Sequence, residues 1–441
     1  MNKNKTSNPK KVQNILIVNV HSAKNAGDYA LLKQTIFYLE KAFMDINITI
    51  MTNWPKESAL SQLGKKIIAS PWWIVKVWDN KIKPRYQVLA LFTGFLRLLL
   101  FRIDKWKCLS WLITKEWWNL FSIYKNTDLV VAVSGNQLFS SGRFGWPLLV
   151  VGFPIYMARF FKKKIIVFPQ SVGPLTSKFD RNYVRFLYNN VDKLYIRDQE
   201  SLDLICRLNI KKSNPSFMHD VAFTFPPGNC NSTKKNFHKE IFNPSLKKLG
   251  MTVIASMPSY LDAENMQRYY LCIAKTIDSL INLHDFHVFL FCQVIGPTDD
   301  ENDNFGIKQV LELLPFNEQD RVHIINQELY PSELKACYGY MDVFLASRLH
   351  SGIFSLSMGV PTLFIGYLYK TIGVLRAMEL EKYYVDLENI SIHDMTTQIT
   401  NMWNEKEEIK YKIMEKTKVI EEELACFPKQ LIADLYNYHE N

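Results

Sequence analysis

Two series of alternating apolar and amphipathic segments constrain the fold most strongly. The first series predicts strands over 14–20, 128–134, 164–170 and 193–198, and helices over 28–43, 147–160, 178–190 and 199–208. The second predicts strands over 251–257, 286–293, 321–325, 342–347 and 361–366, and helices over 263–282, 331–340 and 350–358. Such alternation is typical of βαβ units, in which parallel strands are joined by helices.

A polar segment with Pro and Gly, residues 226–250, separates the two series and has the composition of a linker. With 441 residues the chain is long enough for two domains with separate cores. We therefore predict Rossmann-like domains over 12–225 and 251–441 that face a cleft. In such open parallel sheets, ligands bind at the carboxyl ends of the strands.

The formal charge of +10 is unevenly distributed. Residues 1–11 contribute +4 and residues 72–125 contribute +7, so the rest of the chain is close to neutral. No nucleic-acid-binding motif accompanies the basic segments, and we expect no nucleic-acid partner. The seven cysteines contain no C-x-x-C pair, which predicts reduced thiols in a cytoplasm. The polar N-terminus shows no signal peptide.

The stretch "SRLHSGIFSLSMGVPTLFIGYLYK" (347–370) places basic side chains at two successive turns after predicted strands. Ser347, Arg348 and His350 open one helix, and Lys370 opens the next. Helix N-termini favour anions, and Ser347 is a suitable N-cap. The alternative is that Arg348 pairs with an acid and His350 is a core histidine. The second basic turn favours a binding site.

The first turn, "NVHSAKNAGDYALL" (19–32), lacks the G-x-G-x-x-G dinucleotide motif. Asn25 and Asp28 stand at the predicted helix start. Asp28 either caps this helix or takes a proton from an attacking hydroxyl, and His21 is a rival base.

Further turns follow other predicted strands. Gly135 lies in a glycine-rich turn over 134–147, and Ser171 lies in "QSVGPL" (170–175). Arg197 ends a strand and Asp198 starts a helix, either for ligand binding or as a simple salt bridge. The pair His219 and Asp220 in "MHDVAFTF" (218–225) carries less weight.

Taken together, "NAGDYALL", "DLVVAVSGNQLF", "QSVGP", "IRDQES", "HDVAF" and "SRLHSGIFSLSMGVPTLFIGYLYKTIGVL" resemble the polysaccharide pyruvyl transferase family, in its order and over residues 14–375. The resemblance implies a glycosyltransferase-B-like fold, with the acceptor on the first domain and the donor on the second. It also implies transfer of the enolpyruvyl unit of phosphoenolpyruvate onto two sugar hydroxyls as a cyclic ketal. One departure is Gly135-Asn136-Gln137, where the family usually has a run of glycines.

In the reaction that this resemblance implies, Arg197, Arg348 and His350 serve donor binding and catalysis, and Asp28 matches the family's acidic residue. Arginine binds carboxylate and phosphate in a bidentate manner, and histidine is a suitable general acid near neutral pH. Lys370, Ser347, Asn25, Gly135 and Ser171 are further candidate binding residues. The chemistry requires no metal or cofactor, and we expect neither.

Residues 72–125 hold seven of the ten tryptophans together with the +7 charge. The longest charge-free apolar run in the core of this insert, 86–96, is too short to span a bilayer. The insert either lies in the plane of an anionic membrane or packs on the first domain as a helical hairpin. The membrane alternative suits a polyprenyl-linked acceptor in exopolysaccharide or capsule synthesis, at the inner face of the cell membrane.

Two other functions remain open at this point. A glycosyltransferase of the same fold would hold the diphosphate of a nucleotide sugar at Arg348 and Lys370. A non-catalytic, membrane-docked scaffold of capsule assembly would need no catalytic residues, and the joint presence of Arg197, Arg348 and His350 argues against it.

Overall fold

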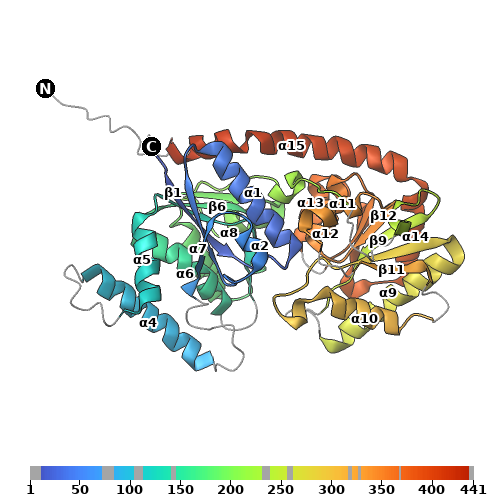
Figure 1. Ribbon diagram of the computed structural model, residues 1–441, viewed down its shortest axis with the longest axis horizontal. Helices are drawn as coiled ribbons and strands as arrows, with labels where there is room; N and C mark the ends of the chain where they lie inside the picture. Colours follow the sequence, from blue (N-terminus) through green and yellow to red (C-terminus); the bar gives the residue numbers. More distant parts are fainter. Residues whose placement is uncertain are drawn as a thin grey trace.

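The structure is a computed structural model that describes residues 11–71, 84–103, 113–140, 146–230, 239–255, 262–315, 320–325, 329–366 and 369–436. Two parallel sheets stand side by side, each covered by helices (Figure 1). The predicted pair of doubly wound α/β domains is thereby confirmed.

The first sheet has the strand order β3-β2-β1-β4-β6-β7-β8, with β5 paired to β6. Its strands are β1 (Asn14–Val20), β2 (Asn47–Thr52), β3 (Lys66–Ala69), β4 (Leu129–Ala132), β5 (Gly135–Leu138), β6 (Lys164–Val172), β7 (Lys193–Ile196) and β8 (Ser216–Phe217). The helices are α1 (Ala26–Ala42), α2 (Ser58–Ser61), α4 (Pro84–Ile103), α5 (Lys115–Asn126), α6 (Trp146–Phe160), α7 (Lys178–Tyr188) and α8 (Gln199–Arg207), with the 3₁₀ turns η2 (Val221–Thr224) and η3 (Lys239–Phe242).

The second sheet has the order β11-β10-β9-β12-β13-β14. Its strands are β9 (Lys247–Thr252), β10 (Phe286–Phe291), β11 (Val322–Ile325), β12 (Val343–Ala346), β13 (Thr362–Gly366) and β14 (Tyr384–Asp386). The helices are α9 (Ala263–His284), α10 (Asp303–Glu312), α11 (Pro331–Tyr338), α12 (Leu349–Ser357), α13 (Tyr369–Ala377), α14 (Ile392–Asn404) and α15 (Lys406–Tyr436), with the 3₁₀ turns η4 (Asp299–Glu301), η6 (Glu381–Tyr383) and η7 (Leu387–Asn389).

Strand β9 begins at Lys247, inside the segment that the composition assigned to a linker. Its first residues are lysines, and Lys248 is buried because its ammonium group donates to the carbonyl of Ile241. Hydropathy therefore misses the start of this strand. The division of the chain at 226–250 stays a prediction.

Strand β1 shows how the first sheet is buried on both faces. Ile15 and Ile17 belong to one apolar cluster, and Leu16 and Val18 belong to the other, as the alternation of side chains along a strand requires. Helix α1 covers the first face, and α5, α6, α7 and α8 cover the second.

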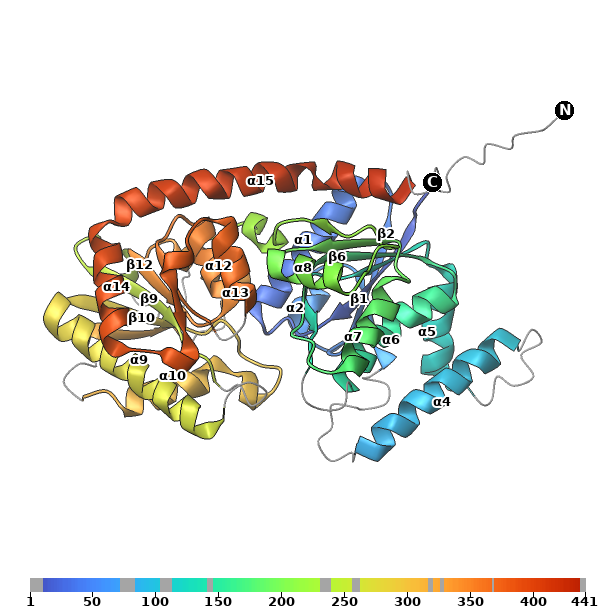
Figure 2. The same ribbon diagram turned by 180° about the vertical axis from the view of Figure 1, so that it is seen from behind.

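The last helix, α15, runs along both domains (Figures 1 and 2). Near its start, Lys406 pairs with Asp342 of the second domain at 2.6 Å. Near its end, Phe427 packs edge-on against Phe168 and Tyr195 of the first sheet, with ring centroids 5.1 and 5.0 Å apart. The helix therefore completes the core of the first domain with residues from the end of the sequence.

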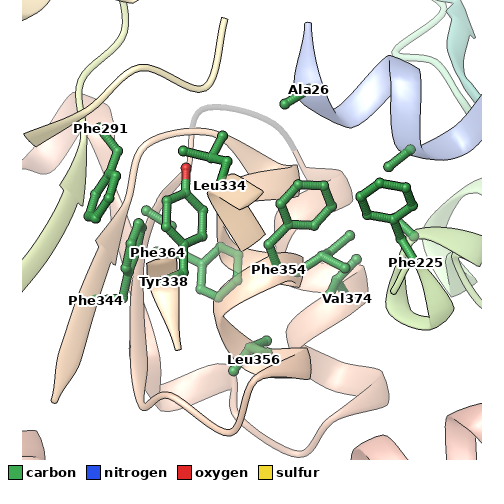
Figure 3. Close-up of a cluster of buried hydrophobic side chains, with 14 of the residues drawn as sticks. Ala26, Phe225, Phe291, Leu334, Tyr338, Phe344, Phe354, Leu356, Phe364 and Val374 are labelled. Atoms are coloured by element: carbon green, nitrogen blue, oxygen red, sulfur yellow. The ribbon is translucent and has the colours of Figure 1, made fainter. Parts of the chain in front are cut away.

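An apolar contact also joins the domains behind helix α12. Phe354 of α12 stacks on Phe225, which directly follows η2, with ring centroids 5.7 Å apart (Figure 3). On its other side, α12 approaches the second sheet closely, because Gly352 leaves room for the ring of Phe364. Helix α12 is therefore fixed between the two domains.

The structure pairs Cys230 with Cys337 in a disulfide, with Cα atoms 5.3 Å apart. The prediction of reduced thiols was wrong for this pair. The two residues are 107 positions apart and their spacing carries no local motif, so only the folded chain brings them together. Cys206, Cys272, Cys292 and Cys426 are free.

Candidate active site between the two domains

Two of the predicted turns, the one that carries Asp28 and the one that carries Arg348 and His350, follow strands at the points where the order of each sheet reverses. In the first sheet this point lies between β1 and β4, and in the second between β9 and β12. Ligands of open parallel sheets bind at these points. Helix α1 follows β1 and helix α12 follows β12, and their N-terminal turns meet. The backbone of Gly27 lies so close to His350 that a Cβ there would be 2.2 Å from the imidazole Nδ1.

Backbone hydrogen bonds fix the first turn to the second domain. Asn25 forms an antiparallel bridge with Val294, and the N–H of Ile295 donates to the carbonyl of Lys24 at 3.0 Å. Asn25 also caps helix α1, because its Oδ1 accepts from the N–H groups of Gly27 and Asp28. Asn25 therefore has a structural role, and the carboxylate of Asp28 is left for other partners.

Asp28 pairs with His21, whose Nδ1 lies 3.4 Å from Oδ2 of Asp28. Strand β1 is irregular between Ile17 and Val20, and Asn19 adopts a φ of 63° there, just before His21. Desolvation alone would lower the pKa of His21, but the hydrogen bond and the charge of Asp28 outweigh it and raise that pKa. Desolvation would likewise raise the pKa of Asp28, but His21 lowers it.

Glu301 of turn η4 brings a second-domain carboxylate to this pair. Burial raises the pKa of Glu301, the charge of Asp28 adds to the increase, and the charge of His21 opposes it. His21 therefore faces acids from both domains, and its raised pKa suits a group that accepts a proton near neutral pH.

Arg197 leaves the end of β7 and is almost fully buried, with a side chain 2% exposed. Its Nη1 donates to Oδ2 of Asp220 at 2.5 Å, and its Nε donates to Oγ of Ser171 at 2.8 Å. The same Oδ2 lies 3.8 Å from Nε2 of His350. Asp220 thus connects Arg197 of the first domain with His350 of the second. Asp198 is not the partner of Arg197, since it caps helix α8.

Arg348 pairs with Asp303 of helix α10, and its side chain is 17% exposed. Its Nη2 and Nε lie 2.6 and 3.2 Å from Oδ1 of Asp303. The other oxygen, Oδ2, accepts from the N–H groups of Gln293 and Val294. Burial raises the pKa of Asp303 and the charge of Arg348 opposes the increase. Arg348 therefore has an acid partner, and it is more exposed than Arg197, so its role in binding stays a prediction.

The structure places the remaining predicted residues as follows. Ser347 is buried, and its Oγ accepts a hydrogen bond from the hydroxyl of Tyr269 at 2.7 Å. The prediction of Ser347 as the N-cap of α12 was wrong, because Arg348 occupies that position. Gly135 lies in β5, which pairs with β6 beside Ser171. Lys370 lies in the first turn of α13, and its side chain is outside the described residues, as is Tyr367.

Asp28, Ser171, Arg197 and His350 therefore gather where the two domains meet. Sequence reasoning gave Asp220 too little weight and missed Asp303. A signal existed for each, because Asp220 directly precedes the apolar run 221–225, and Asp303 ends an acidic stretch in the connection after β10. Among the described residues, no group of three or more His, Cys, Asp or Glu is placed to hold a metal ion.

The sequence of the chain is similar to those of known proteins. The model of the polysaccharide pyruvyl transferase family matches residues 25–369. The amylovoran biosynthesis protein AmsJ of Erwinia amylovora is 22% identical over 408 residues, which cover 90% of this chain and 94% of that protein.

Solved structures show the same fold at low identity. HepE of Anabaena, in complex with UDP and glucose, aligns with a TM-score of 0.57 at 10% identity, covering 96% of this chain and 99% of that chain. A putative UDP-N-acetylglucosamine 2-epimerase of Listeria monocytogenes aligns with a TM-score of 0.60 at 10% identity, covering 98% and 97%. These likenesses support the predicted glycosyltransferase-B-like fold.

Proposed function

Because the chain belongs to the polysaccharide pyruvyl transferase family, we propose that it transfers pyruvate from phosphoenolpyruvate onto a sugar of a polysaccharide repeat unit as a cyclic ketal. The observation that carries this proposal is His350, which stands in the first turn of α12 against Gly27, with the Asp220 carboxylate 3.8 Å from its Nε2. A histidine held beside a buried carboxylate is well suited to deliver a proton.

His350 is the general acid of this reaction. It donates a proton to the methylene carbon of phosphoenolpyruvate, and the neighbouring carbon becomes an oxocarbenium centre. Asp220 stabilises the protonated imidazole beforehand. Arg197 donates to the carboxylate of Asp220, and Ser171 holds the Arg197 guanidinium by accepting from its Nε. Arg197 therefore acts as a positioning residue, because the donor cannot reach a side chain that is 2% exposed in this conformation.

The donor anion is bound at the N-terminus of α12. Arg348 is partly exposed there, and the N-terminus of the helix favours a phosphate or a carboxylate. Nε and Nη2 of Arg348 both donate to Oδ1 of Asp303, which fixes the plane of the guanidinium.

His21 and Asp28 form the base. A sugar hydroxyl attacks the oxocarbenium carbon and gives its proton to His21, while Asp28 stabilises the resulting charge. The carbon–oxygen bond to phosphate then breaks. A neighbouring hydroxyl attacks the second oxocarbenium centre, its proton leaves with the phosphate, and the ring of the ketal closes. The balance is one phosphoenolpyruvate and one diol converted into one ketal and one phosphate.

The acceptor in this proposal is a polyprenyl-linked repeat unit of an exopolysaccharide or capsule, reached at the inner face of the cell membrane. The relative AmsJ is named for the biosynthesis of an exopolysaccharide, amylovoran, which supports an acceptor of this class. Membrane contact in this proposal occurs at a part of the insert 72–125, which carries the +7 charge.

The test is phosphate release from phosphoenolpyruvate by the purified protein, with a panel of free and lipid-linked sugars and mass analysis of the product. Phosphate release that depends on the acceptor and a ketal in the product are expected. Turnover of a UDP- or GDP-sugar on the same panel, without consumption of phosphoenolpyruvate, would assign the chain to nucleotide-sugar transfer instead.

A further inference from the structure

The described parts of the basic, tryptophan-rich insert divide into a buried helix and a half-exposed one. In α5, Trp117, Phe121 and Tyr124 are buried in the core of the first domain. Helix α4 lies outside α5 at the edge of the first domain in both views (Figures 1 and 2). The packing alternative therefore holds for α5, and the question of a docking surface concerns α4.

One face of α4 is anchored to the domain by ring contacts. Phe95 packs against Phe153 of α6, and Phe101 packs against Trp118 of α5, with ring centroids 5.5 and 4.8 Å apart. Leu98 between them is fully buried. These contacts fix the rotation of the helix about its axis, so the opposite face points consistently away from the domain.

That opposite face is apolar. Phe92, Leu96 and Leu99 are 67%, 49% and 47% exposed, and their spacing of four and three residues places them on one stripe of the helix. A stripe of three large apolar side chains on a helix that already buries its other face is unusual for a surface exposed only to water.

The charge of this segment favours a partner of opposite charge for the stripe. Residues 84–103 contain three arginines and no acidic residue. A second copy of this chain would bring another insert with a net charge of +7 to the same contact, which is electrostatically unfavourable. A bilayer with anionic headgroups offers both the opposite charge and an apolar interior. In the part of the chain that the structure describes, no helix is long and apolar enough to cross a membrane, so α4 would lie in its plane.

We propose that α4 docks the protein on an anionic bilayer by inserting Phe92, Leu96 and Leu99 below the headgroups. This inference rests on the proposed function, because a lipid-linked acceptor requires an enzyme at the membrane surface. The ring contacts attach α4 to α5 and α6. These two helices pack on the first sheet, whose strands β1 and β7 precede His21 and Arg197.

The experiment measures co-sedimentation of the full chain with phosphatidylglycerol-containing and pure phosphatidylcholine vesicles at low and high salt. We expect binding to the anionic vesicles that weakens with salt. The triple variant Phe92→Ser, Leu96→Ser, Leu99→Ser should bind at least about tenfold more weakly, because it removes the apolar side chains whose insertion drives binding. The control is Met44→Ser, Leu271→Ser, Leu283→Ser, which removes three comparably exposed residues elsewhere and should bind like the wild type.

A second measurement is independent of variant stability. Phe92→Trp should be quenched by bromine-labelled lipid acyl chains when anionic vesicles are added, and Met44→Trp should show no added quenching. Absence of binding by the folded wild type, equal binding by the triple variant, or loss of self-association by that variant without lipid would each overturn the proposal. Failure of the proposed function is distinguishable, because vesicle binding would then persist without any turnover of phosphoenolpyruvate.

Discussion

The imidazole of His350 has the carboxylate of Asp220 near its Nε2 and the backbone of Gly27 close to its Nδ1. We predict that His350→Gln lowers kcat by about 10²–10⁴-fold, the usual range for removal of a positioned acid, with a smaller change in the KM for phosphoenolpyruvate. The measurement is steady-state phosphate release. His393→Gln, an exposed histidine of α14, is the control. A kcat close to that of the wild type would remove His350 from the mechanism.

A substitution at Gly27 tests the close approach of the Gly27 backbone to the His350 imidazole. Gly27→Ala adds a methyl group 2.2 Å from Nδ1 of His350, closer than real Cβ atoms approach a ring, so the imidazole must move. We expect a loss of activity of at least about tenfold, because a displacement of about 1 Å in a catalytic group is costly. Lys33→Ala, at an exposed position of the same helix, should leave the rate unchanged. Full activity of Gly27→Ala would show that the precise place of His350 is unimportant.

At the scale of elements, Lys335 of α11 holds the turn η2, which follows Asp220, by hydrogen bonds to backbone carbonyls. Its ammonium group donates to the carbonyls of Phe223 and Phe225 at 3.2 and 2.5 Å, and it lies 5.9 Å from the centroid of the Phe354 ring. Burial lowers the pKa of Lys335 to about 8, although the charge of Glu421 on α15 opposes this shift. The unfolded chain therefore retains this proton at pH values where the folded chain has lost it.

Because the folded pKa is the lower one, stability should rise with pH above about 8. We predict that the unfolding free energy of the wild type, relative to that of Lys335→Met, increases by about 2 kcal/mol between pH 7.5 and 9.5, at 1.36 kcal/mol per pH unit. Chemical denaturation at several pH values measures this difference. The same comparison with Lys429→Met, an exposed lysine of α15, should be independent of pH. A flat difference for Lys335→Met would mean that the lysine is hydrated in the folded state.

Helix α15 provides a second test at this scale. Phe427 is fully buried among Tyr38, Phe168 and Tyr195, so Phe427→Ala should lower the unfolding free energy by about 3–5 kcal/mol. Tyr411 lies in the same helix and is 73% exposed. Tyr411→Ala should therefore change the unfolding free energy by no more than about 0.5 kcal/mol. Equal effects would show that the end of α15 does not contribute to the core of the first domain.

Local patterns predicted the elements that define the site. Strand β1 matches its predicted range of 14–20, and helix α12 differs from its predicted range by one residue at each end. Because parallel strands share an edge, the meeting of Asp28, Arg197 and His350 also followed from their places after strands. The acid partners did not follow, because Arg348 and Asp303 are 45 residues apart and pair only when β10 and β12 flank β9. Helix α15 was not predicted, although the spacing of Ile413, Ile420, Leu424 and Phe427 is that of an amphipathic helix.

At the scale of the whole molecule, the two domains are joined around the site. The bridge between Asn25 and Val294 lies on one side, and Arg376 of α13 pairs with Glu200 of α8 on another. Helix α15 adds the contacts of Phe427 and the hydrogen bond from Tyr195 to Asp434 at 2.6 Å. These contacts come from distant parts of the chain, so the site forms only when both domains are folded and in contact.

The path of α15 has a consequence for synthesis on the ribosome. The strands of the first sheet leave the ribosome before those of the second, but Phe427, which covers Phe168 and Tyr195, emerges only after both sheets. A nascent chain that already contains both sheets therefore still exposes an apolar surface on its first domain. Helix α15 covers it, and a chain that stops before this helix would present that surface to chaperones and proteases.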